Sequence, residues 1–168
     1  MATPIKLRSH KVLIKAPRER VFQMMSSIGS GRIKGDNNES SKVLCRDGNH
    51  LIAQFRTKAG PLWYTTIEEI DFEPPERITF KHLSGPLHYA WEEFVYNDVD
   101  GDTEVIHNGE FIWHPFPVIG KLAGLMYTRP AFERVIEKHL KTIKDAAEER
   151  AARSHVFPRN TEAEAPAS

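Results

Sequence analysis

The sequence predicts an α+β domain in which a curved antiparallel seven-stranded sheet wraps around a long C-terminal helix. Three observations lead to this prediction. A chain of 168 residues is long enough to bury one hydrophobic core. From Ser41 to Trp113 apolar residues recur with the period of a strand, and turn-forming residues interrupt them at regular intervals. After Pro130 the apolar period becomes that of a helix.

One strand and two short helices are predicted before the main part of the sheet. The strand runs from Lys11 to Ile14 and ends before Pro17, because proline cannot continue a strand ladder but fits the first turn of a helix. Apolar residues at helical spacing predict a helix from Pro17 to Ser27. A second short helical turn is expected through Ile33.

Six strands are predicted between Ser41 and Trp113. The clearest runs from His50 to Lys58, where Leu51, Ala53 and Phe55 alternate with more polar residues. Residues that favour tight turns separate the strands. These corners are Asp47-Gly48, Lys58-Ala59-Gly60-Pro61, Pro74-Pro75, Ser84-Gly85-Pro86 and Asp98-Val99-Asp100-Gly101.

The last helix is predicted from about Pro130 to Arg153, which corresponds to about 35 Å at 1.5 Å per residue. Its apolar residues recur every three or four positions and need a surface to pack against. Pro130 either kinks this helix or starts it. Residues 154–168 are small, acidic and proline-bearing, which predicts a disordered tail after a domain of residues 1–153.

The composition argues against several classes of function. Because 23 Lys and Arg balance 23 Asp and Glu, no net charge favours nucleic acids or anionic membranes. No apolar stretch reaches the roughly 20 residues that a membrane span needs, so stable membrane insertion is not expected. The single cysteine, Cys45, excludes an internal disulfide and a thiolate-rich zinc site, and it predicts a cytoplasmic protein.

Four stretches carry a resemblance to a known superfamily: Val12 to Phe22, Ile70 to Phe80, the corner from Gly101 to Val105, and Leu140 to Lys144 with Glu148. On these stretches the chain resembles the START-like proteins, also called the SRPBCC or polyketide cyclase and dehydrase superfamily, which have the helix-grip fold. The resemblance extends over nearly the whole chain up to residue 153.

This resemblance implies a hydrophobic cavity between the concave sheet and the C-terminal helix. Members of the superfamily use this cavity for lipids, sterols, plant hormones or aromatic polyketides, and some of them are enzymes. No catalytic motif of the cyclases and aromatases matches this sequence residue by residue. Catalysis therefore enters as an alternative to binding.

Strand alternation predicts which polar side chains face this cavity. His82 shares a strand face with apolar residues, and so does His107 on the last strand. For residues 88–96 the alternation fits either face, and similarity to the superfamily's pattern favours the one that carries Glu92. On this basis the three polar side chains lie on neighbouring strands and point the same way.

We expect His82, Glu92 and His107 to converge as hydrogen-bonding or acid/base groups, because a buried carboxylate must be protonated or paired. The alternative is a satisfied polar network that only fixes the register of the strands. The residues expected to line the cavity are Phe55, Phe80, His82, Glu92, Phe94, Tyr96, His107, Phe111, Phe116, Leu125, Phe132 and Ile136.

The stretch before the last helix is rich in apolar residues. Phe116, Leu122, Leu125 and Met126 are expected to form a gate over the ligand, or else to pack plainly at the base of the helix.

Histidine is also a common metal ligand. Four histidines fall on neighbouring strands or at their ends: His82, His88, His107 and His114. They are not all predicted on the same face of the sheet, and no pair has the spacing of metal ligands on a helix. No metal and no cofactor are therefore expected.

The leading hypothesis is a cytoplasmic binder of a hydrophobic or aromatic small molecule, lipid-like or polyketide-like. The first alternative is a cofactor-independent cyclase, aromatase, dehydratase-type lyase or hydrolase, in which His107 or His82 acts as base and Glu92 as its proton partner. The second is an interaction module with a filled core. The expected partner is a hydrophobic small molecule, not nucleic acid, and both a monomer and a homodimer are compatible with the sequence.

Overall fold

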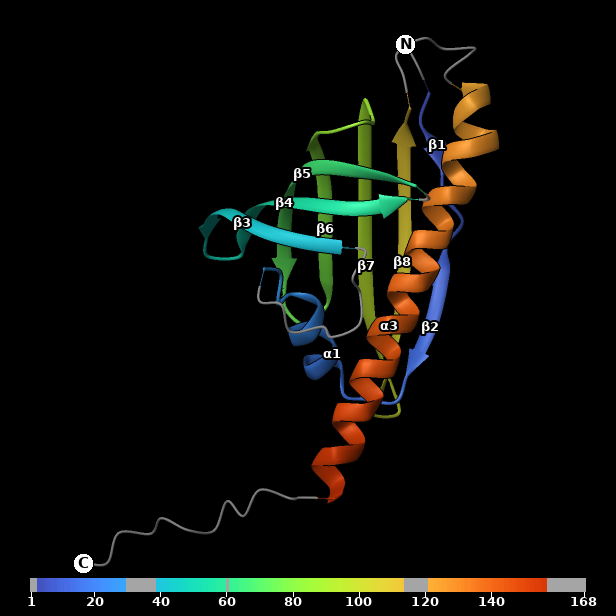
Figure 1. Ribbon diagram of the computed structural model, residues 1–168. Helices are drawn as coiled ribbons and strands as arrows, with labels where there is room; N and C mark the ends of the chain where they lie inside the picture. The colour runs from blue at the N-terminus through green and yellow to red at the C-terminus, as the bar shows by residue number, and fades with distance from the viewer. Residues whose placement is uncertain (1–2, 30–38, 60, 114–120, 157–168) are drawn as a thin grey trace, which may run out of the picture.

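A computed structural model describes residues 3–29, 39–59, 61–113 and 121–156 of the chain. One antiparallel sheet curves beside the long helix α3, and the short helix α1 lies at one end of the sheet (Figure 1). The elements are β1 (Ile5–Lys6), β2 (His10–Ile14), α1 (Arg18–Met25), β3 (Glu39–Asp47), β4 (His50–Ala59), β5 (Leu62–Glu73), β6 (Arg77–Ser84), β7 (Tyr89–Val99), β8 (Asp102–Ile112), the π-helical turn η1 (Gly124–Thr128) and α3 (Arg129–Val156).

The strand order is β1-β8-β7-β6-β5-β4-β3, and β2 also pairs with β8. The six strands predicted between residues 41 and 113 are confirmed, and the predicted first strand is joined on the same edge by β1, which pairs Ile5 with Phe111. In Figure 1, strands β3 to β5 run across the direction of β6 to β8, as the twist of a long sheet requires. This twist makes the face toward α3 concave.

The predicted corners fall between the strands. Gly48 has a φ of 55° in the hairpin between β3 and β4, and Asp100 and Gly101 have φ values of 55° and 86° between β7 and β8. Positive φ at such positions is what primed hairpin turns need, and it explains the Asp-Gly sequences there. Strand β4 continues to Ala59, one residue beyond the predicted Lys58.

The core lies between the concave face and α3. The inner faces of the strands bury residues such as Leu51, Ile70 and Val105 completely. The predicted apolar stripe of α3 packs against them, and each large side chain buried in this way contributes about 1.5–3 kcal/mol. Its buried members are Ile136, Leu140, Ile143, Ala147 and Ala151.

Pro130 does not start the helical run: it is the second residue of α3, and residues 121–128 before it are already helical. The π-helical turn η1 directly precedes it, and the Arg129 N–H bonds the carbonyl of Gly124. Helix α3 continues past the predicted end at Arg153 to Val156.

Three predicted features lie outside the described residues: the helical turn through Ile33, Phe116 with the stretch around it, and the tail from residue 157 onward. None of the described helices combines the length and the apolar character that crossing a membrane requires.

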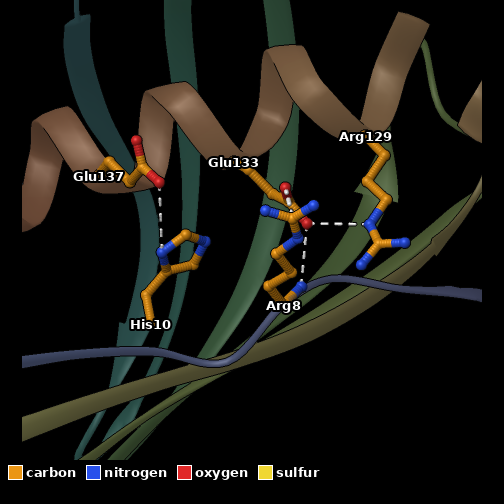
Figure 2. Close-up of polar contacts among 5 residues, drawn as sticks. All are labelled: Arg8, His10, Arg129, Glu133 and Glu137. Atoms are coloured by element: carbon orange, nitrogen blue, oxygen red, sulfur yellow. Dashed lines mark hydrogen bonds and ion pairs between the residues drawn. The ribbon is translucent and has the colours of Figure 1, made fainter. Parts of the chain in front are cut away.

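Charged side chains fix α3 to the chain between β1 and β2 (Figure 2). The backbone N–H of Arg8 donates to Glu133 Oε1 over 3.0 Å, and the Arg129 side chain donates to the same oxygen over 2.9 Å. Next to them, His10 Nδ1 lies 3.7 Å from a carboxylate oxygen of Glu137. Glu133, itself bound by Arg129, therefore holds the segment before β2, and Glu137 lies beside the first residue of that strand.

The same arrangement continues at the other end of β2. The backbone N–H of Lys15 donates to Glu148 Oε1 over 2.9 Å, and Lys144 Nζ donates to the carbonyl of Leu13 over 2.7 Å. Because β2 pairs only with β8, its outer edge carries backbone groups that no neighbouring strand can bind. Side chains of α3 satisfy them, which fixes where the helix crosses the sheet.

We predict that Glu133→Gln lowers the free energy of unfolding by about 1–2 kcal/mol at pH 7, because charge-assisted hydrogen bonds are lost. Burial alone would raise the pKa of Glu133, but the Arg8 N–H and the Arg129 guanidinium outweigh it and hold the pKa below its usual value. This stabilisation is present above the unfolded-state pKa of about 4.3 and is lost as pH falls through the lower folded-state pKa. Urea unfolding measured from pH 7 down to pH 3 tests both statements.

The matched control is Glu137→Gln, since the Glu137 side chain is 63% exposed and its ion pair is loose. Its effect should stay below about 0.5 kcal/mol. A Glu133→Gln deficit that is equal at every pH would contradict this account of the contact.

Candidate functional site

A cavity of about 710 Å³ lies between the sheet and α3. Its volume falls within the range of about 300–1,000 Å³ that is typical of small-molecule sites. One wall comes from the inner faces of β4 to β7, and the opposite wall comes from the first turns of α3. Met24 and Met25 of α1 line it as well, and the exposed side chains of Trp113 and Tyr127 also border it.

Aromatic side chains form much of the sheet wall. The rings of Phe55 and Phe80 meet edge to face at 6.3 Å, and those of Phe80 and Phe94 at 5.8 Å. Phe132 and Ile136 of α3 face them across the cavity. All five are residues that the sequence analysis expected to line the cavity, and together they give it a largely apolar surface.

Glu92 brings a carboxylate to this wall. Its Oε2 lies 2.8 Å from His107 Nε2, and its other oxygen, Oε1, has no hydrogen-bond partner among the described residues. In the register of β7 and β8 Glu92 lies opposite Gly109, and a Cβ at that position would come within 3.1 Å of Glu92 Cγ. The absence of a side chain at Gly109 therefore leaves room for Glu92 to reach diagonally to His107.

The environment of His107 determines the charge of this pair. His107 is fully buried, and within the described structure its Nδ1 has no hydrogen-bond partner. A protonated imidazole would leave a charged N–H buried without an acceptor, which is costly. A neutral ring with its proton on Nε2 fits the geometry instead, because Nε2 then donates to the Glu92 carboxylate.

His82 lines the cavity from β6 and is half-buried. Burial lowers the pKa of His82 below its ordinary value, although the backbone of Leu87 and the carboxylate of Glu92 act in the opposite direction. Its Nε2 is buried and makes no hydrogen bond within the described residues. At neutral pH the site therefore contains a neutral His82 imidazole whose Nε2 has no partner within the described residues.

Strand β5 adds polar residues that the sequence analysis missed: Tyr64, Thr66 and Glu68 line the cavity. The Thr66 hydroxyl donates to Glu68 Oε1 over 2.8 Å. Counting back in steps of two from the buried Ile70 would have placed these three side chains on the inner face. The signal was hidden because Trp63 and Ile67 make the opposite face of this half of β5 the more apolar one.

Four of the described residues that were expected at the cavity are not among its lining. Tyr96 is buried beneath α1, packs edge to face on Phe22 at 5.4 Å, and donates its hydroxyl to Met25 Sδ over 3.0 Å. Phe111 packs in a separate small core, with its ring 5.9 Å from that of Phe132.

His107 is fully buried behind the lining residue Phe94, with the two ring centres 4.7 Å apart. Leu125 is exposed on η1. Phe116, also expected at the cavity, lies outside the described residues.

The expected gate is not formed by its described members. Leu122, Leu125 and Met126 are all exposed, and none of them lines the cavity. Their neighbours Tyr127 and Thr128 line it instead. Within the described part of the chain, no group of three or more His, Cys, Asp or Glu side chains is placed to hold a metal ion.

We predict that the Glu92→Gln substitution lowers the pKa of His82 further, because the carboxylate that favours the imidazolium form is removed. The chemical shift of the His82 ring, followed by NMR from pH 4 to 8, measures this pKa in both proteins. Glu93→Gln on the outer face of β7 is the control and should leave it unchanged. An increase of the His82 pKa in Glu92→Gln would mean that the two side chains do not interact as described.

Comparisons with known proteins address the fold. No protein-family model matches the sequence, and a search of curated proteins finds no match. Solved structures match well. The Zhui aromatase/cyclase from Streptomyces sp. R1128 is 16% identical, with a TM-score of 0.70 over 91% of this chain and 96% of that one.

Two further structures agree with this match. A START superfamily protein from Mycobacterium smegmatis is 13% identical, with a TM-score of 0.68 over 86% of this chain and 99% of that one. Ara h 8.0201 is 11% identical, with a TM-score of 0.61 over 88% and 97% of the two chains. The chain therefore has the START-like helix-grip fold.

Proposed function

We propose that the protein binds a hydrophobic or aromatic small molecule in the cavity between the sheet and α3. The observation that carries the proposal is the cavity itself, about 710 Å³ in volume, with aromatic rings on its sheet wall and Phe132, Val135 and Ile136 on its helix wall. A cavity of this size also argues against an interaction module with a filled core.

The energetics suit an apolar ligand. Burying about 300 Å² of apolar ligand surface contributes about 7 kcal/mol before the entropic cost of association. The few polar groups of the lining then orient the ligand. Structural neighbours support the proposal at the level of the superfamily, since they include an aromatase/cyclase and a START superfamily protein.

A second candidate function is proton-transfer catalysis of the cyclase or dehydratase type. The specific observation in its favour is His82, which lines the cavity and whose buried Nε2 has no hydrogen-bond partner within the described residues, with Glu92 acting on the same ring. In this hypothesis the neutral His82 accepts a proton from the bound substrate, and the ionised Glu92 stabilises the imidazolium that forms. His107 would then keep Glu92 in place and would not itself touch the substrate.

We predict that the neutral dye N-phenyl-1-naphthylamine binds with enhanced fluorescence and that Val135→Trp weakens this binding at least tenfold. Val135 lines the cavity, and an indole at this position would occupy ligand space. Fluorescence titration measures both dissociation constants. The control is Arg134→Trp, which adds the same indole to a neighbouring exposed position of α3 that does not line the cavity.

Circular dichroism of both variants checks that the fold is kept. Equal dye affinity in Val135→Trp and Arg134→Trp would place the dye elsewhere on the protein and contradict the proposal. No dye binding to the unsubstituted protein would contradict it as well.

A further inference from the structure

We infer that the cavity selects ligands whose polar end donates a hydrogen bond, a hydroxyl or a protonated amine, and that it rejects carboxylates and other anions. This inference rests on the proposed binding function and names the class of ligand. It follows from the charges of the lining, the charge states of the histidines, and the positions of the nearby cations.

The charged residues of the described lining are two glutamates, Glu68 and Glu92, and no Lys or Arg is among them. A carboxylate ligand would lose its hydration without meeting a positive charge, and it would lie near like charges. An alcohol or an ammonium group meets carboxylate acceptors instead. The lining therefore discriminates by sign of charge.

The histidines do not reverse this sign. The buried Nδ1 of His107 has no acceptor within the described residues, which favours a ring whose single proton is on Nε2 and is donated to Glu92; such a pair keeps the negative charge of the carboxylate. Burial lowers the pKa of His82, which therefore stays neutral as well. His139 of α3 also lines the cavity.

Four cations that neighbour lining residues in the sequence are held outside the cavity. Arg56 and Lys58 lie on the outer face of β4, where the Arg56 guanidinium is 4.9 Å and the Lys58 ammonium 6.0 Å from the centre of the Trp63 ring. On α3, Arg129 is bound to Glu133 and Lys144 to the carbonyl of Leu13, both at the sheet edge. Each of these cations already has a partner away from the ligand space.

Glu92 offers the acceptor for the ligand's polar end. Its Oε1 has no partner among the described residues, while Oε2 is fixed by His107. Phe80 is its direct register partner on β6, so an aromatic ring lies beside the carboxylate. A protonated amine placed there would gain both an ion pair and a cation–π contact.

Three ligands that share one apolar body test the inference: 2-(1-naphthyl)ethanol, 2-(1-naphthyl)ethylamine and 1-naphthylacetic acid. Each competes with N-phenyl-1-naphthylamine for the protein at pH 8, where the amine is protonated and the acid ionised. We expect the alcohol and the amine to displace the dye, and the acid to bind at least tenfold more weakly than the alcohol.

Two variants test whether Glu92 causes this selectivity. In Glu92→Gln the dissociation constants of the acid and the alcohol should differ by less than threefold. The amine should bind this variant at least fivefold more weakly than it binds the unsubstituted protein. The matched control is Glu93→Gln, one residue along β7, whose carboxylate accepts from Asn108 Nδ2 over 3.1 Å on the opposite face. It should leave all three affinities unchanged.

The outcomes separate the inference from the function on which it rests. The inferred selectivity is wrong, while the binding function stands, if the acid binds the unsubstituted protein as tightly as the alcohol. The same holds if the amine binds as weakly as the acid. If neither the dye nor any of the three ligands binds, both are wrong. The comparison of the three ligands on the unsubstituted protein holds even where Glu92→Gln fails to fold.

Discussion

The attachment of α3 to one edge of the sheet is the constraint on which the cavity depends. Backbone groups on the outer side of β2 and just before it are bound by Glu133, Lys144 and Glu148, so the helix crosses the sheet beside β2 and packs mainly on β2 and α1. The curved strands β4 to β7 then stand away from the helix. The space left between them is the cavity, with an aromatic wall on one side and the first turns of α3 on the other.

The register of β7 and β8 determines the chemistry of this space. It places Glu92 opposite Gly109, and the missing side chain at Gly109 lets the carboxylate reach a fully buried histidine. A neutral His107 can hold Glu92 in one orientation without cancelling its charge. The pair of Glu92 and His107 therefore fixes the orientation of the Glu92 carboxylate and gives the cavity its negative character.

The sequence predicted the fold and much of the sheet wall, because strand alternation reports which face a side chain occupies. It reports nothing about what covers that face at each point along the strand. Tyr96 and Phe111 are on the predicted face, but α1 covers the first and the start of α3 covers the second. The contact between Arg8 and Glu133 joins residues 125 positions apart, and neither residue carries a local signal of it.

Intermolecular nuclear Overhauser effects between bound N-phenyl-1-naphthylamine and the protein test the central claim most directly, since they show which side chains the ligand touches. The account predicts contacts from one ligand to both walls, to the rings of Phe80 and Phe94 and to the methyl groups of Val135 and Ile136. Contacts confined to the exposed side chains of Leu122 and Met126 would place the ligand on the surface and contradict the account.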